Sequence, residues 1–263
     1  MDTKIVMGFV EVAEKAAIAA SKWRGLGKKN DADQAAVEAM RNAFNEMDFS
    51  GRIVIGEGER DEAPMLYIGE ELGRGGIEID IAVDPLEGTN LCAHNQPNAL
   101  TTLALAPKGA LLYAPDTYMN KIAAGPLAKG KIHIDKSVAE NIQAVASAYN
   151  KPVSEVNVCV LDRERHEQII KEVREAGARV RLISDGDVFG AIATALDGTG
   201  IDLYLGAGGA PEGVLAACGL KAIGGVFMGR FQFRNEDEIK RAKETSGVDI
   251  DGVLTMDDLV RSD

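Results

Sequence analysis

The chain has 263 residues, of which 46% are hydrophobic, and it carries a formal net charge of −12. This composition excludes an intrinsically disordered chain, and the length allows one large α/β domain or two closely packed lobes. The acidic balance argues against nucleic acid or an anionic membrane as the main partner. An anionic substrate would need local cations, supplied by Lys and Arg side chains or by bound metal ions.

The three cysteines, Cys92, Cys159 and Cys218, are far apart and form no Cys-x-x-Cys pair. This number and spacing argue against a disulfide scaffold and against a zinc–thiolate site. The N-terminal segment is amphipathic and interrupted by charges, unlike a signal peptide, and no stretch has the length of a transmembrane helix. These features predict a protein of the reducing cytoplasm.

Two helices are expected at the start of the chain. Apolar residues recur there every three or four positions, which predicts a helix that ends at the glycine-rich segment 25–30. A second helix is predicted from Asn30, its N-cap, to about Met47, with Asp31 and Asp33 in its first turn. The residues of the first apolar face are Phe9, Ala13, Ala16, Ala20 and Trp23.

A series of strands is expected next. Glu57 directly follows the first of them, and Asp84 directly follows the second, so both acids leave a strand at its carboxyl end. This part of the chain is therefore rich in strands, with two helices in front. The predicted strands are 52–56, 78–83, 99–106, 110–114 and 121–125.

The second part of the chain alternates between strands and helices. The order βαβαβα predicts a parallel sheet with right-handed crossovers. We place the boundary near residue 150, which gives lobes 1–150 and 151–263. The predicted strands are 157–161, 178–183 and 201–205, and the predicted helices are 166–177, 188–196 and 212–224.

Polar residues follow each of the three strands in the second part. The segments are Asp-Arg-Glu-Arg (162–165), Ser-Asp-Gly-Asp (184–187) and a glycine-rich run (206–213). The carboxyl ends of strands in open α/β sheets form the ligand crevice. The topology therefore predicts one binding edge built from three separate loops.

The motif Asp84-Pro85-Leu86-Glu87-Gly88-Thr89 carries the strongest chemical signal. It places two carboxylates three residues apart on a turn stiffened by proline, with a threonine hydroxyl beside them. Such a turn can bridge two hard cations and hold a water against a metal. The alternative is an ordinary turn that caps a helix.

Three further acids are candidate metal ligands. With Asp84 and Glu87, the candidates are Glu57, Glu212 at a helix start, and Asp33. For Asp33 and Glu212 the alternative is a solvated acid in the first turn of a helix. All of these donors are oxygens, so Mg²⁺ or Mn²⁺ is favoured over Zn²⁺. The acids Glu59, Asp61 and Glu62 are expected to form a solvated loop, and the alternative is that one of them assists a metal-held water.

Three features suit a phosphorylated ligand. The run 206–213 predicts a phosphate-binding nest at a helix N-terminus, or else a sharp turn. Arg163 and Arg165 can grip a phosphate with forked guanidinium donors, or else belong to a charged surface turn. Tyr118 is a candidate sugar contact, although packing is the commoner use of such a residue.

The residues together resemble one family, the class II fructose-1,6-bisphosphatases of bacteria. The resemblance spans nearly the whole chain and keeps the family's order. The lithium-sensitive phosphatases, which include the inositol monophosphatases, are more distantly similar. The matching stretches are GKKNDADQAAVEAM, IVIGEGERDEAPMLYIGEELG, DIAVDPLEGTNLCA, APDTYM, AKG, LDRERH, AGARVRLISDGDV and GAGGAPEGV.

The resemblance implies an α/β fold, a layered α-β-α-β-α sandwich, with most metal ligands in the first lobe and most substrate contacts in the second. It implies hydrolysis of the 1-phosphate of fructose-1,6-bisphosphate, a step of gluconeogenesis, with Mg²⁺ or Mn²⁺. The implied metal ligands are Asp33, Glu57, Asp84, Glu87 and Glu212. The implied catalytic residues are Thr89, Asp33, Glu57, Lys29 and Asp61. The implied substrate contacts are Glu87, Gly88, Thr89, Tyr118, Arg163, Glu164, Arg165, Asp185, Gly186, Asp187 and Gly209.

Two departures from the family pattern stand out. Glu164 occupies a position where the family has proline, which predicts a looser turn. The chain ends at 263, where family members continue through further strands.

Sedoheptulose-1,7-bisphosphate and inositol phosphate remain alternative substrates, and a non-catalytic sugar-phosphate or metal binder remains an alternative of another class. A homo-oligomer is expected from the family.

Overall fold

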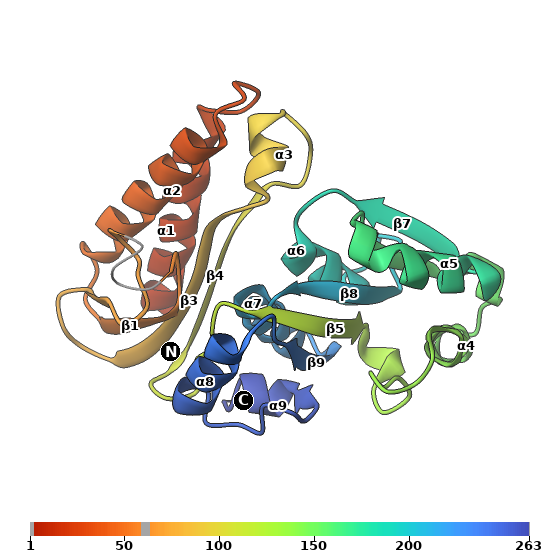
Figure 1. Ribbon diagram of the computed structural model, residues 1–263. Helices are drawn as coiled ribbons and strands as arrows, with labels where there is room; N and C mark the ends of the chain where they lie inside the picture. The colour runs from red at the N-terminus through yellow and green to blue at the C-terminus, as the bar shows by residue number, and fades with distance from the viewer. Residues whose placement is uncertain (1–2, 59–63, 263) are drawn as a thin grey trace. The chain divides into compact units, whose positions relative to one another are not determined.

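The computed structural model describes residues 3–58 and 64–262. The chain divides into two compact units, one up to Tyr113 and the other from Ala114 to Arg261 (Figure 1). The structure places the division earlier than the predicted boundary near residue 150. The reason is that strand β5 (Tyr118–Ala124) pairs with two strands of the second unit.

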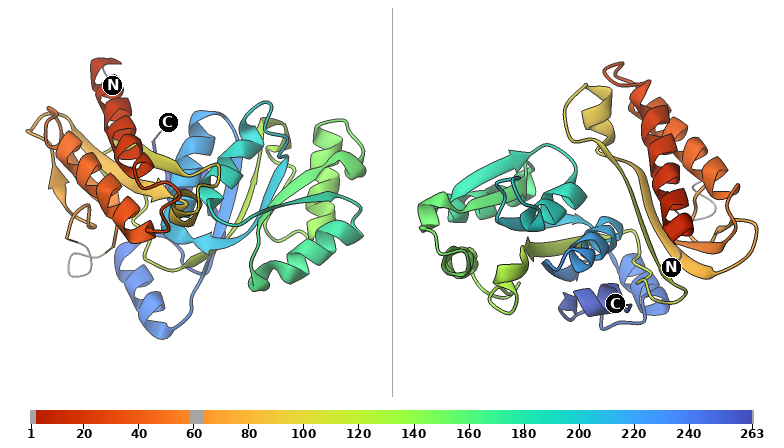
Figure 2. Two further views of the ribbon diagram at one scale, coloured as in Figure 1. Left: turned by 90° about the horizontal axis from the view of Figure 1, so that it is seen from above. Right: turned by 180° about the vertical axis from the view of Figure 1, so that it is seen from behind.

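The first unit packs two helices, α1 (Thr3–Ser21) and α2 (Lys29–Phe44), on a sheet with strand order β2-β1-β3-β4 (Figures 1 and 2). β1 and β3 are parallel, and the other pairs are antiparallel. The strands are β2 (Glu71–Leu72), β1 (Ser50–Ile55), β3 (Glu78–Glu87) and β4 (Leu100–Pro107), and the short helix α3 (Thr89–Ala93) follows β3.

The core of this unit lies between the helices and the sheet. Phe9 of α1, Phe44 of α2 and Phe49 contact one another at ring-centroid distances of 5.0 to 6.1 Å. The apolar face predicted for α1 is confirmed at Phe9, Ala16 and Ala20, which are buried with Val12, whereas Trp23 lies past the helix end at Ser21. Burial of this stripe drives both helices onto the sheet.

The second unit contains a sheet with strand order β10-β9-β5-β8-β6-β7. The predicted parallel pairs are confirmed for β6 with β7 and β6 with β8, whereas β5 runs antiparallel to both β8 and β9. The strands besides β5 are β6 (Asn157–Leu161), β7 (Arg179–Ile183), β8 (Leu203–Gly209), β9 (Val226–Gln232) and β10 (Leu254–Thr255).

Helices cover both faces of this second sheet. α4 and α5 bury their apolar residues against Ile122, Val158 and Leu205, while α6 and α7 pack on the opposite face (Figure 1). These layers confirm the predicted α/β class. The helices are α4 (Val138–Ala148), α5 (Glu167–Glu175), α6 (Asp187–Ile192), α7 (Ala210–Ala222), α8 (Glu236–Thr245) and α9 (Met256–Leu259).

Several local predictions differ from the structure. The segment 110–114 is not a strand, and Lys28 rather than Asn30 takes the N-cap position of α2. The 84–87 motif is not a free turn, because β3 continues through it with a register shift against β4. The glycine-rich run is not a loop either, since β8 extends to Gly209 and α7 begins at Ala210.

None of the helices in the described part of the chain is long and apolar enough to cross a membrane. The three cysteines are free thiols, and Cys92 and Cys159 are buried. Burial raises the pKa of Cys159 and of Cys218 to about 12, so both stay protonated near neutral pH.

Candidate active site

The acidic residues of the first unit lie at one edge of its sheet. Since β1 and β3 are parallel, with Ile55 opposite Ala82, their carboxyl ends meet at the same edge. Glu57 follows the end of β1 at this edge, and Asp84 and Glu87 lie in the C-terminal part of β3. The predicted proximity of these three acids to one sheet edge therefore follows from the topology.

The end of β3 has a distorted but well-anchored backbone. Asp84 Oδ1 accepts a hydrogen bond of 3.1 Å from the Leu86 N–H, and the Thr101 hydroxyl donates to the Pro85 carbonyl at 2.9 Å. Gly88 has a φ of +80°, which favours glycine, and it leads into α3. The motif therefore redirects the chain at a β-bulge instead of a simple turn, and Glu87 is buried.

The start of α2 lies beside α3. The N–H groups of Gly25 and Gly27 donate to the carbonyls of Cys92 and Ala93, both at 2.9 Å. These bonds fix the loop before α2, so the helix presents Lys29 and Asp33 at the end that borders α3.

Thr89 is the first residue of α3 and is half-buried, while Lys29 is exposed. Asp33 is half-buried, and burial raises its pKa. A neighbouring cation would reverse this shift.

The remaining predicted residues of the first unit follow β1. Glu57 donates its N–H to the Leu66 carbonyl at 3.0 Å and is half-buried. Gly56 must lack a side chain, because a Cβ there would lie 2.0 Å from the Leu66 oxygen. Asp61 lies outside the described residues.

No group of three or more His, Cys, Asp or Glu side chains is gathered as a ready metal site within residues 3–58 and 64–262. The candidate donors are all carboxylates, which suits a hard divalent cation. The proposed ligand set therefore stays a prediction.

In the second unit, Arg165 and His166 hold the backbone of one residue of β8, Ala207, at both its carbonyl and its N–H. Arg165 donates to the Ala207 carbonyl through Nε and Nη2, at 3.1 and 2.8 Å. His166 Nε2 accepts the Ala207 N–H at 2.8 Å, and its Nδ1 donates to the Leu161 carbonyl at 2.8 Å. His166 is therefore neutral, and burial lowers its pKa.

Tyr118 is the first residue of β5, and two guanidinium groups lie close to its ring. Arg165 lies 5.0 Å from the ring centroid and Arg234 lies 5.3 Å from it. Both distances are within the range of cation–π attraction. The predicted neighbours Tyr118 and Arg165 are thus in contact, and Arg234 is an addition that the sequence did not suggest.

A buried charged cluster lies on the other face of the same sheet. Lys121 Nζ is 2.7 Å from Asp187 Oδ2, and the Tyr204 hydroxyl donates to the same oxygen at 3.3 Å. Lys121 and Asp187 are almost fully buried, so this ion pair is shielded from solvent.

Glu212 belongs to this cluster. Its Oε2 atom is buried and has no hydrogen-bond partner among the described residues. Burial raises the pKa of Glu212, and the nearby charge of Lys121 opposes that shift. A Cβ on Gly209 would lie 1.9 Å from Glu212 Oε2, so the glycine makes room for the carboxylate. An unsatisfied buried oxygen is compatible with a bound cation.

The other predicted residues lie at the carboxyl ends of β6 and β7. Arg163 is half-buried and donates to the Asp162 carbonyl at 2.9 Å, and Glu164 is exposed at the start of a 3₁₀ turn, Glu164–His166. Asp185 is half-buried, and Gly186 adopts φ +84° as it caps α6. The predicted binding edge thus contains all three polar segments.

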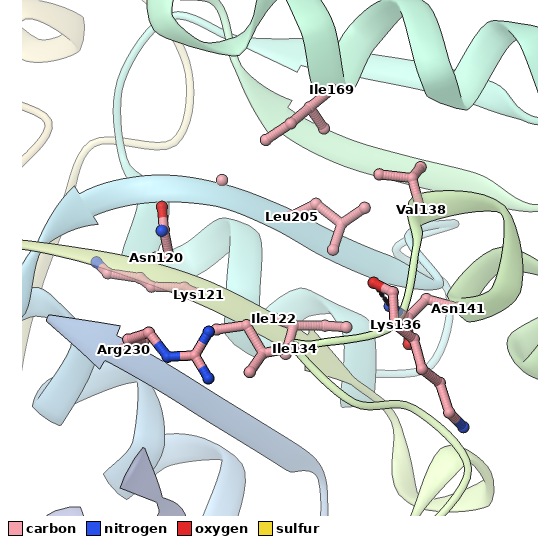
Figure 3. Close-up of a pocket in the computed structure, with 11 residues that line it drawn as sticks. Asn120, Lys121, Ile122, Ile134, Lys136, Val138, Asn141, Ile169, Leu205 and Arg230 are labelled. Atoms are coloured by element: carbon pink, nitrogen blue, oxygen red, sulfur yellow. Dashed lines mark hydrogen bonds between the residues drawn. The ribbon is translucent and has the colours of Figure 1, made fainter. Parts of the chain in front are cut away.

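A separate pocket of about 230 Å³ lies over the β5–β8 part of this sheet (Figure 3). Ile122, Ile169 and Leu205 form an apolar wall, with Asn120 and Arg230 toward one end. None of the predicted catalytic, substrate or metal residues lines it. Lys121 lines the pocket as well, so the pocket borders the charged cluster of Lys121 and Asp187.

Sequence reasoning missed three residues of the binding edge: Lys121, His166 and Arg234. Lys121 is the only charged residue within the run MNKIAAG, and a lone charge in an apolar strand is a signal of burial with a partner. Arg234 was missed because 226–232 was not recognised as a strand, although it reads VFMGRFQ and follows a helix.

The chain is similar in sequence to a known family along nearly its whole length. The model of the family described as bacterial fructose-1,6-bisphosphatase, glpX-encoded, matches residues 3–263. A D-fructose 1,6-bisphosphatase class 2/sedoheptulose 1,7-bisphosphatase of Thermosynechococcus vestitus is 52% identical over 246 residues, which cover 89% of this chain and 71% of the relative. The protein of the same name from Trichodesmium erythraeum is 48% identical, over 98% of this chain and 82% of the relative.

A third relative of this name, from Synechocystis, is 51% identical over 249 residues. The family model covers both units, since its match runs from residue 3 to residue 263. The chain therefore belongs to the family of glpX-encoded bacterial fructose-1,6-bisphosphatases, which are metal-dependent phosphatases.

Proposed function

We propose that this phosphatase hydrolyses the 1-phosphate of fructose-1,6-bisphosphate to fructose-6-phosphate and phosphate, a step of gluconeogenesis. The observation that carries the proposal is the family match over residues 3–263, together with relatives near 50% identity that are named for this reaction. The arginines at the carboxyl edge of the second sheet add support, since they suit a phosphorylated sugar.

The acids of the first sheet edge are the proposed metal ligands. Asp33, Glu57, Asp84 and Glu87 would hold divalent cations, Mg²⁺ or Mn²⁺, and Glu212 with its unsatisfied oxygen is the proposed ligand from the second unit. When bound, such cations neutralise phosphate charge and make a water more acidic. The carboxylates then fix the cations, and Lys29 helps to balance the phosphate charge.

Thr89 and the arginines are proposed to orient the reactants. The Thr89 hydroxyl would orient the attacking water for in-line displacement, with Asp61 as the assisting carboxylate. Arg163 and Arg165 would hold the phosphate that is not cleaved. Tyr118, Glu164, Asp185, Gly186, Asp187, Gly88 and Gly209 complete the proposed substrate contacts. This positioning lowers the entropic part of the barrier.

Sedoheptulose-1,7-bisphosphate is the second candidate substrate, because the relatives' names include it. Hydrolysis of inositol phosphate, expected of the wider lithium-sensitive phosphatases, is a third possibility that a substrate panel tests. We further propose a cytoplasmic homo-oligomer, and the free cysteines support the reducing location.

The decisive experiment measures phosphate release from fructose-1,6-bisphosphate with Mn²⁺, Mg²⁺ or EDTA in parallel. We expect turnover with at least one metal and none with EDTA. Metal-dependent substrate binding without phosphate release would instead indicate a non-catalytic binding protein. Faster release from sedoheptulose-1,7-bisphosphate would reassign the main substrate.

A further inference from the structure

Four strands of the second sheet direct their carboxyl ends to the same edge. β6, β7 and β8 are parallel, and β9 is parallel to them because both β8 and β9 run antiparallel to β5. The residues that follow β9 therefore reach the same edge as the three polar segments. Arg234 is two residues past the end of β9. Its position thus satisfies the topological rule that locates ligand sites in such sheets.

Arg234 is held beside Tyr118 by a buried carboxylate. Its Nε lies 2.5 Å from Glu238 Oε1, and its Nη2 donates to the Asp116 carbonyl at 3.3 Å. Glu238 is only 1% exposed and also accepts the Thr117 hydroxyl at 2.6 Å. Burial alone would raise the pKa of Glu238, but these hydrogen bonds outweigh it and lower the pKa. Glu238 therefore stays charged and fixes Arg234 in place.

The guanidinium groups of Arg165 and Arg234 therefore both lie close to the ring of Tyr118. Arg165 and Arg234 lie 5.0 and 5.3 Å from the Tyr118 centroid, and each spends only two N–H groups on its described protein partners. An arginine has five N–H donors, so both keep donors for a ligand. Like charges this close repel, and an anion between them removes that repulsion.

We propose that Arg234 is a specificity-determining residue that, with Arg165, binds the phosphate group of the substrate that is not cleaved. This inference rests on the proposed function, since it requires a bisphosphate substrate. Glu238 is a positioning residue in this arrangement, because it acts through Arg234. The pair of guanidinium groups recognises a terminal dianion and not the sugar, so it serves six-carbon and seven-carbon bisphosphates alike.

The test compares Arg234→Gln with wild type on fructose-1,6-bisphosphate and on fructose-1-phosphate, which lacks the second phosphate. We expect the KM for the bisphosphate to rise about 10- to 100-fold, the scale of losing charge-assisted hydrogen bonds. The kcat/KM for the monophosphate should not change. Arg241→Gln, an exposed arginine of α8, is the matched control and should behave as wild type.

A second variant covers the case in which Arg234→Gln fails to fold. Arg234→Lys keeps the charge beside Glu238 but loses the guanidinium fork, so the bisphosphate KM should still rise several-fold. A wild-type KM for either folded variant would overturn the role of Arg234 while leaving the proposed reaction intact. A wild-type protein without preference for the bisphosphate would overturn the recognition of a second phosphate by Arg234 and Arg165. Absence of phosphate release from fructose-1,6-bisphosphate by the wild type would overturn the proposed reaction itself.

Discussion

Asp80 of the first unit is buried with different partners from Asp187 and Glu238 of the second. In the first unit, Asp80 in the middle of β3 accepts the N–H groups of Gly109 and Leu111 at 2.7 and 3.3 Å, so it pins a loop. In the second unit, Asp187 and Glu238 lie at the edge of the sheet and pair with Lys121 and Arg234. Asp80 is therefore part of the scaffold, whereas Asp187 and Glu238 hold cationic side chains at the strand ends of the candidate site.

The largest effect is expected when an acid is removed from the edge of the first sheet, because that change tests a proposed metal ligand instead of a scaffold acid. Asp84→Ala should lower the turnover number by at least about 10⁴-fold, because a group essential to the chemistry is lost. Phosphate release under saturating metal measures this. Glu78→Gln, at the exposed opposite end of the same strand, is the control and should retain activity. Near-normal turnover by Asp84→Ala would remove Asp84 from the metal site.

The buried ion pair of the second unit is the next target. Lys121→Met should lower the free energy of unfolding by about 3–5 kcal/mol, because it leaves Asp187 charged and unpaired in the interior. Urea unfolding in the presence of EDTA measures the effect. A double variant, Lys121→Met with Asp187→Leu, should recover part of the loss. Unchanged stability of the single variant would show that the pair is not shielded as described.

The scaffold acid of the first unit should affect stability without affecting chemistry. Asp80→Ala should cost about 1–3 kcal/mol of unfolding free energy, since two amide groups lose their acceptor. Its KM values should stay at those of wild type. A selective loss of kcat in a fully folded Asp80→Ala protein would contradict the division between scaffold and site.

His166 should make stability depend on pH below about 6.5. Its folded pKa is lowered by burial, so the unfolded chain binds more protons as the pH falls below the ordinary value. The contribution of His166 to the free energy of unfolding is therefore at its maximum above pH 6.5, and it is lost as the pH falls through the folded pKa. Thermal melts between pH 5 and 7.5 should show this slope, and His166→Gln should flatten it.

The smallest effect is expected at Tyr118. Tyr118→Phe keeps the ring that both guanidinium groups contact and should leave KM nearly unchanged. Tyr118→Leu removes the cation–π attraction and should raise the bisphosphate KM about two- to five-fold. If Tyr118→Phe alone raises KM to this extent, the hydroxyl contacts the substrate and the ring does not decide affinity.

Much of the fold could be predicted from the sequence because its periodicities are strong. The strand 157–161 and the helices of the second part lie where their apolar patterns indicated, and the parallel order followed from their alternation. The bulge after Asp84 could not be predicted, since proline and glycine suggest a turn while pairing with β4 keeps the segment in the sheet. Lys121 was missed because its partner, Asp187, is 66 residues away in sequence, and Arg234 was missed because the strand before it was not recognised.

The backbone of Ala207 is held in both flanking peptide groups, with an imidazole on its N–H and a guanidinium on its carbonyl. Nuclear magnetic resonance of its amide proton can therefore detect a change in either contact. Withdrawal of Arg165 toward a ligand would move that resonance, while slow exchange with deuterated solvent would show that His166 still holds it. A single labelled alanine could thus follow ligand arrival and scaffold integrity separately.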